Sequence, residues 1–157
     1  MPNPAAGVFQ LLYVSDIAPH VAKRLPTVVE DILIASTRNN ARDAISGFLV
    51  CDGARFAQML EGSREAVEAC FAAITADDRH THISVRSTGL VEARQYSRWS
   101  MCAWTLSAQE DALLNAAHIE LDLRGAARGA LAQHLLGISQ RHADELDALH
   151  AEILRRG

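Results

Sequence analysis

The sequence contains no uninterrupted apolar run near the roughly 18 residues that a membrane-spanning helix needs, so no membrane segment is predicted. It also has no excess of positive charge, because the formal net charge is -4 at pH 7. Nucleic-acid surfaces require clustered cations, and direct nucleic-acid binding is therefore not expected. The first residues lack the basic region and long apolar stretch of a secretory signal peptide, which favours a cytoplasmic location.

Cysteine is scarce and shows no metal-ligand spacing. Cys51, Cys70 and Cys102 stand far apart, each in an apolar segment, which favours small buried side chains in a reducing compartment. The pair His80 and His82 has no acidic or cysteine neighbour at ligand spacing, so no metal site is predicted. The G-x-G-x-x-G, P-loop and nucleophile-elbow motifs are absent as well, so none of these fingerprints identifies a ligand.

The hydrophobic pattern predicts one α+β domain. The chain has 157 residues, of which 49% are hydrophobic, enough for a packed core. Helical spacing of apolar residues begins at Pro26 and after Ser63, and Asp52-Gly53 is typical of a tight hairpin. Strands are predicted over 8–15, 45–51, 55–61, 83–91 and 98–104. The order β-α-β-β-α-β-β, with two helices on one face, indicates a ferredoxin-like sandwich whose first and third strands are central neighbours.

The part of the chain after Ser107 has a different pattern. It is rich in Ala and Leu and shows no strand alternation. Two helices are predicted from the apolar positions Leu131, Leu135 and Ile138, and Leu146, Leu149 and Ile153. We therefore divide the chain into a domain over residues 1–105 and a helical extension over 106–157. The apolar stripes of the extension favour self-association into a homo-oligomer.

Gln58 is an unusual residue for its position. Alternation along 55–61 places its side chain on the same face as Phe56 and Leu60, toward the predicted helices. Burying an unpaired amide costs on the order of 1–3 kcal/mol, so it should have hydrogen-bond partners. Tyr13 faces the same way from the neighbouring central strand. The two side chains form either a satisfied core pair or the wall of a polar ligand site.

Two further groups of residues are open to a structural and a functional interpretation. Asn39-Asn40 ends the first long helix, which is common for asparagine, and one of the two amides is then free to bind a flat heterocycle. In Trp99-Ser100-Met101, the predicted strand places Trp99 and Met101 on one face. Such an aromatic–methionine pair is found in cores and also beside cofactors.

Together, in this order and spacing, the motifs resemble the signature of the BLUF family, blue-light sensors that use FAD. The matching motifs are Tyr13 with Ser15, Asn39-Asn40, Ile45-Ser46-Gly47, Phe56-x-Gln58-x-Leu60-Glu61-Gly62, Asp78-Arg79-His80 and Trp99-x-Met101. The resemblance runs from about Val8 to Trp104. Two departures are a longer loop after Tyr13 and Ser46 in place of a common threonine.

The resemblance implies that FAD, or FMN, is held noncovalently between the two helices and the sheet. The positions that match cofactor-binding residues are Tyr13, Ser15, Asn39, Asn40, Gln58, Arg79, His80, Trp99 and Met101. Tyr13 matches the tyrosine that donates an electron to the excited flavin. Gln58 matches the glutamine that bridges this phenol and the N5 and C4 carbonyl edge of the ring.

The resemblance also implies contacts for four other positions around the cofactor. Asn40 matches the asparagine that hydrogen-bonds the carbonyl and imide region of the ring, and Asn39 matches a second, more variable ring contact. Arg79 and His80 match a pair near the cofactor.

The resemblance also implies a photoreceptor without catalytic turnover. Trp99 and Met101 match a pair that exchanges places during signalling, so the signal is expected to pass through the last strand to residues 106–157. The chain is too short for a cyclase or phosphodiesterase domain, so an unidentified downstream protein is the expected partner. A flavin-dependent oxidoreductase is an alternative, although Gln58 and Tyr13 would fill the edge that a substrate needs. A ferredoxin-like binding module for another small ligand, with both residues as plain core, is the third interpretation.

Overall fold

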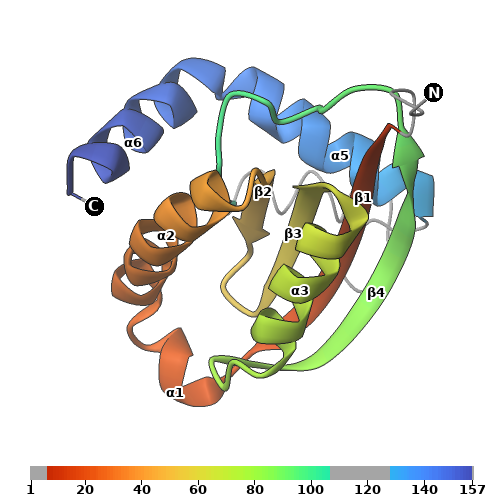
Figure 1. The fold of residues 1–157 in the computed structure, drawn as a ribbon. Helices are drawn as coiled ribbons and strands as arrows, with labels where there is room; N and C mark the ends of the chain where they lie inside the picture. The colour runs from red at the N-terminus through yellow and green to blue at the C-terminus, as the bar shows by residue number, and fades with distance from the viewer. Residues whose placement is uncertain (1–6, 107–127, 157) are drawn as a thin grey trace.

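The computed structural model describes residues 7–106 and 128–156 (Figure 1). In chain order its elements are β1 (Val8–Ile17), α1 (Pro19–Ala22), α2 (Leu25–Arg42), β2 (Ser46–Cys51), β3 (Arg55–Gly62), α3 (Arg64–Thr75), β4 (His80–Val91), β5 (Ala103–Thr105), α5 (Arg128–Arg141) and α6 (Ala143–Arg156). The strands form one sheet in the order β4-β1-β3-β2-β5, in which only β5 pairs in parallel. α2 and α3 pack on one face of it. The predicted α+β, ferredoxin-like arrangement is confirmed, with β1 and β3 as central neighbours.

The helices begin where the local sequence predicts. Pro26 lies in the first turn of α2, where its missing N–H costs no hydrogen bond. Ser63 caps α3, because its hydroxyl oxygen accepts from the Ala66 N–H at 3.1 Å. The segment between β1 and α2 was expected to be a loop, but it contains the short helix α1. Pro19 starts this turn, and burial of Val21 holds it against the core.

The predicted hairpin between β2 and β3 is confirmed. Asp52 accepts from the N–H groups of Ala54 and Arg55 through one carboxylate oxygen, at 3.0 and 2.7 Å. Gly53 has a φ of 90°, which side-chain-bearing residues rarely adopt. The turn fixes the register of the two strands, in which Leu49 lies opposite Gln58.

The first of the two C-terminal helices, α5, covers the second face of the sheet. The second core, on this face, combines Leu12, Phe48, Val50 and Met59 from the strands with Leu131, Leu135 and Ile138 from α5. α6 then runs beside α2, where Ile153 joins the first core (Figure 1). Every residue of β2 is buried, as expected for a strand covered on both faces.

The last strand is shorter than predicted. It was expected over 98–104, but β5 has only three residues, and the chain before it is irregular. Trp99 and Met101 were predicted to share a strand face, but they do not. Met101 belongs to the first core and Trp99 to the second. The prediction was wrong because alternation of side chains holds only where the backbone is extended.

No helix within residues 7–106 and 128–156 is long and apolar enough to cross a membrane. The same described ranges contain no group of three or more His, Cys, Asp or Glu side chains that could hold a metal ion. The three cysteines are free thiols; Cys51 and Cys102 are buried and Cys70 is half-buried.

Candidate functional site

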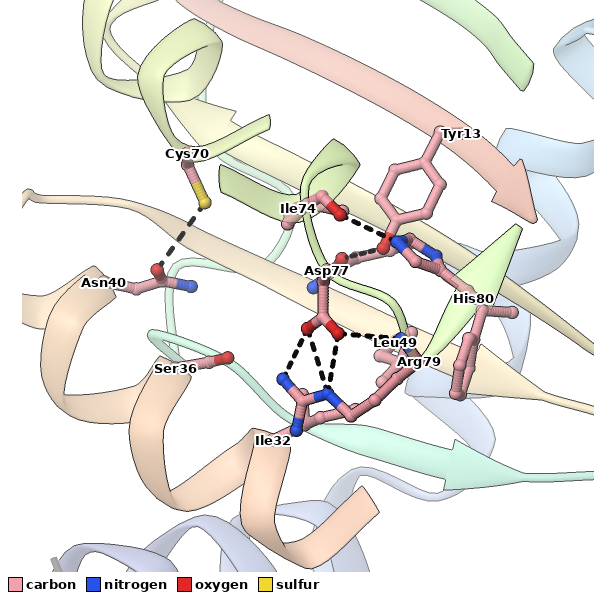
Figure 2. A pocket seen from close by; sticks show the side chains of 12 residues that line it. Tyr13, Ile32, Ser36, Asn40, Leu49, Cys70, Ile74, Asp77, Arg79 and His80 are labelled. Atoms are coloured by element: carbon pink, nitrogen blue, oxygen red, sulfur yellow. Dashed lines mark hydrogen bonds and ion pairs between the residues drawn. The ribbon is translucent and has the colours of Figure 1, made fainter. Parts of the chain in front are cut away.

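A cavity of about 90 Å³ lies between α2, α3 and the sheet (Figure 2). Its lining consists of Tyr13, Ile32, Ser36, Asn40, Leu49, Phe56, Gln58, Cys70, Ile74, Asp77, Arg79 and His80. Five of the predicted site residues are therefore brought together here, although they come from five different elements or loops of the chain.

The centre of the site is a buried hydrogen-bond chain. Tyr13 and Gln58 are direct cross-strand partners on β1 and β3. The Tyr13 hydroxyl donates to Gln58 Oε1 at 2.5 Å, and Gln58 Nε2 donates to Met101 Sδ at 3.3 Å. The amide thus has the partners that its burial requires. Because an amide nitrogen carries two N–H groups, Gln58 retains one more donor for a ligand.

Burial keeps the Tyr13 phenol protonated. Desolvation raises the pKa of Tyr13 far above its usual value, and the nearby Cys70 and Asp77 raise it further. Its ring packs against Phe71 and His80, with centroid distances of 5.5 and 6.0 Å. The site therefore holds a neutral phenol in a fixed orientation, ready to donate through its hydroxyl.

Asn40 presents a second amide from the C-terminal part of α2. Its Nδ2 donates to the Ser100 carbonyl oxygen at 3.0 Å, and its Oδ1 accepts a long contact of 3.9 Å from Cys70 Sγ, facing it from α3 (Figure 2). Burial raises the pKa of Cys70 to about 11, so this sulfur is a thiol donor at neutral pH. Asn39 is exposed and does not line the cavity, because the side chains of neighbouring residues in a helix, here Asn39 and Asn40, point about 100° apart.

His80 and Arg79 form the wall near the start of β4. His80 Nε2 lies 2.8 Å from the Ile74 carbonyl oxygen, which can only accept, so this nitrogen carries the hydrogen. In the neutral imidazole, Nδ1 then accepts from the Ser15 hydroxyl at 2.7 Å. Ser15 thus orients His80 and does not itself line the cavity. Arg79 forms a bidentate pair with Asp77, whose pKa this hydrogen bonding lowers.

Trp99 lies away from the cavity. It is 4% exposed and belongs to the second core, where its ring packs against Phe48. Its indole N–H donates to Asp147 Oδ1 of α6 at 3.0 Å. Of the predicted pair, Met101 therefore reaches the site through Gln58, whereas Trp99 contacts the C-terminal helix.

Sequence reasoning missed three polar lining residues: Ser36, Cys70 and Asp77. Ser36 precedes Asn40 by four residues and so shares its helix face, a spacing that could have identified it. Cys70 was interpreted only as a small buried side chain in an apolar segment. Asp77 carried no signal beyond the turn in which it lies.

The lining fits a flavin ring chemically. A flavin has two apolar faces and one edge of alternating carbonyl and N–H groups. The apolar side chains Ile32, Leu49 and Ile74 suit the faces, and the amides of Gln58 and Asn40 suit the edge. The cavity is smaller than the roughly 300 Å³ of typical ligand sites, so binding the ring requires the lining side chains to move apart.

Fold and site together define a ferredoxin-like domain with a flavin-type cavity under two helices. The BLUF family model, described as "Sensors of blue-light using FAD", matches residues 8–102. The chain belongs to the BLUF family, which senses blue light with a flavin cofactor.

Relatives and solved structures agree with this assignment. The chain is 30% identical over 99 residues to photoactivated adenylate cyclase subunit beta of Euglena longa, covering 63% of this chain and 11% of the relative. It is 30% identical over 82 residues to the blue light- and temperature-regulated antirepressor BluF of Escherichia coli K12, covering 52% of this chain and 20% of the relative. The chain thus spans a small part of these proteins.

Two solved structures have the same fold. The dark-state structure of BlrB, a BLUF protein, is 29% identical with a TM-score of 0.64, covering 86% of this chain and 98% of that one. The photo-activated state of BlsA is 24% identical with a TM-score of 0.69, covering 82% and 94%. Because both alignments extend well beyond residues 8–102, the C-terminal helices belong to the shared architecture.

Proposed function

We propose that Tyr13 and Gln58 carry the photochemistry of this blue-light sensor, next to a flavin held between α2, α3 and the sheet. The observation that supports this is the buried chain from the Tyr13 hydroxyl through Gln58 to Met101, whose middle member lines the cavity. Gln58 and Asn40 would hold the polar edge of the ring. Arg79 and His80 would form the wall beside it.

The geometry suits a coupled transfer of an electron and a proton. The bound flavin supplies an electron acceptor when it absorbs blue light. A phenol that has lost an electron is a strong acid, and the Gln58 oxygen lies 2.5 Å from the Tyr13 hydroxyl, ready to take the proton. The amide can then pass an N–H proton toward the polar edge of the ring and change its tautomer or rotate. When the electron returns to Tyr13, a proton returns through Gln58 to the phenol oxygen, and the hydrogen bonds of Gln58, including its contact with Met101, are left rearranged.

The absorption spectrum tests the proposal. We expect the purified protein to be yellow, to shift its flavin band slightly to the red under blue light, and to recover in the dark. An oxidoreductase would instead be bleached by a reductant and reoxidised by a substrate, and a binding module for another ligand would be colourless. A colourless preparation that takes up no added FAD, or a pigment without a light response, would contradict the function.

We propose that the signal leaves through α6 toward a partner protein, with no catalytic turnover in this chain. Three residues that precede β5 contact this helix. Trp99 Nε1 donates to Asp147, which also pairs with Arg98, and the Ser100 hydroxyl lies 3.4 Å from His150 Nε2. A change at Met101 shifts the backbone on either side of it, so these contacts change as well.

Replacing Asp147 by alanine should separate light sensing from its output. The substitution removes the acceptor for both Trp99 and Arg98 but does not touch the cavity. We expect the red shift to be retained, whereas the light-induced change in hydrogen exchange over residues 143–156 should fall several-fold. Glu152→Ala is the matched control, since Glu152 pairs only with arginines of α6 among the contacts in the described chain. Equal light-induced exchange in both variants would exclude Asp147 from the route.

A further inference from the structure

Glu61 is a fully buried carboxylate outside the cavity. Its Oε1 accepts from the Ser46 hydroxyl and from the Tyr96 backbone N–H, both at 2.9 Å. Its Oε2 accepts from Gln10 Nε2 at 2.8 Å and from the Gln95 N–H at 2.7 Å. Four hydrogen bonds satisfy the charged group, which explains how it is tolerated with 0% exposure.

These four donors come from three parts of the chain. Gln10 belongs to β1 and Ser46 to β2, whereas Gln95 and Tyr96 lie in the irregular segment 92–102. Arg94 adds a second attachment, because its guanidinium donates to Ser46 Oγ at 2.9 Å and to the carbonyl oxygens of Glu61 and Ala44 at 3.3 and 2.6 Å. The start of the segment is therefore fastened to the central strands by side chains, with no strand pairing of its own.

The end of the same segment carries the residues next to the cavity. The Trp99 N–H donates to the Tyr96 carbonyl at 3.1 Å, so the part of the segment that Glu61 holds is directly linked to the part that carries Trp99 and Met101. The Gly47 N–H then donates to the Trp99 carbonyl at 3.2 Å. A Cβ atom at Gly47 would lie 3.0 Å from Met101 Cε, so the Met101 side chain lies tightly against β2. The place of Met101 beside Gln58 thus depends on where the start of the segment is fixed.

We propose that Glu61 is a positioning residue for the photosensor. This proposal rests on the proposed function. Its carboxylate anchors residues 95 and 96, and so holds Met101 against Gln58 and Trp99 against α6. The anchor raises the barrier between the dark and lit arrangements of the segment. A segment held by fewer hydrogen bonds changes arrangement more readily in both directions.

Glu61→Gln in the full chain tests this role. Glutamine keeps the shape but offers one acceptor oxygen and an NH₂ group, so at least two of the four donors lose their partner. The size of the red shift should stay the same, because Tyr13 and Gln58 are untouched. Dark recovery should be about tenfold faster. Ser46→Ala removes one donor to Glu61 and the contact with Arg94, so it should also accelerate dark recovery, but by a smaller factor than Glu61→Gln. This variant decides the question if Glu61→Gln does not fold.

Ser63→Ala is the control for a purely structural effect. It removes the N-cap of α3 and lowers stability, yet the cap does not contact segment 92–102. Its recovery rate should remain within about twofold of the unsubstituted protein. The proposal would be overturned if Glu61→Gln and Ser46→Ala recovered more slowly than Ser63→Ala. It would also be overturned if their recovery were less than about threefold faster than that of Ser63→Ala.

A measurement in the dark distinguishes failure of the anchor from failure of the proposed function. Glu61→Gln should raise hydrogen exchange of the Gln95 and Tyr96 amides, and Ser63→Ala should not. If the unsubstituted protein shows no red shift, the proposed function fails, and the exchange result alone still decides whether Glu61 anchors the segment. Unchanged exchange at both amides would show that it does not.

Discussion

Gln58→Leu is expected to bind flavin and to show no light-induced red shift. Leucine is close to glutamine in size, so the cavity wall keeps its shape. The variant cannot accept the Tyr13 proton or offer a rearranged hydrogen bond to the ring, because its side chain has no polar atom. The Tyr13 hydroxyl loses its acceptor in a buried site, which should lower the free energy of unfolding by about 1–3 kcal/mol. The difference between dark and lit absorption spectra measures the effect.

The matched control for this variant is Gln133→Leu, which makes the same chemical change on an exposed position of α5. It should keep the full red shift and the same recovery rate. A normal shift in Gln58→Leu, with pigment bound, would remove the central element of the proposed photochemistry. Loss of pigment in Gln58→Leu alone would instead assign Gln58 to cofactor binding.

The part of the site that lies on regular strands could be predicted from the sequence. Side chains alternate with a period of two along a strand, so the positions of Phe56 and Leu60 fixed the face of Gln58. The Asp52-Gly53 turn set the register of the hairpin. Because β1 pairs with β3 at the sheet centre, Tyr13 was placed on the same face, and the hydrogen bond of 2.5 Å confirms the pairing.

The segment before β5 could not be predicted in the same way. Its path is set by long-range contacts, in particular those of Glu61 with Gln95 and Tyr96, which leave no local pattern. Trp99 and Met101 therefore face opposite sides of the sheet. The family resemblance drew attention to this pair of residues but did not give their arrangement, and their role in signalling stays a prediction.

The covering of the second face by α5 was also not apparent beforehand. Strands buried on both sides read as continuous apolar runs, and β2, with the sequence SGFLVC, does not show which elements cover it. The extension over 106–157 remains our proposed output segment, and self-association remains a prediction. α6 contacts both α2 and the segment that carries Trp99, so the path from the cavity to this helix is short.

Tyr13→Phe should abolish the photoreaction at its first step. Phenylalanine keeps the packing against Phe71 and His80 but is a much poorer electron donor and has no proton to give. We expect bound flavin with no red shift and a strong rise in flavin fluorescence, because electron transfer from the phenol no longer competes with emission. This rise separates the two central variants, since Gln58→Leu retains the donor.

Tyr96→Phe provides the matched control for the loss of a buried tyrosine hydroxyl. Tyr96 is 1% exposed in the second core, and among the described residues its hydroxyl has no hydrogen-bond partner. Removing that oxygen should leave stability unchanged or slightly raised, and the light response intact. If flavin fluorescence in Tyr13→Phe stayed as low as in Tyr96→Phe, the electron donor would have to be another residue. Trp99 would then be the first candidate, although it lies on the far face of the sheet, because an indole is also oxidised readily.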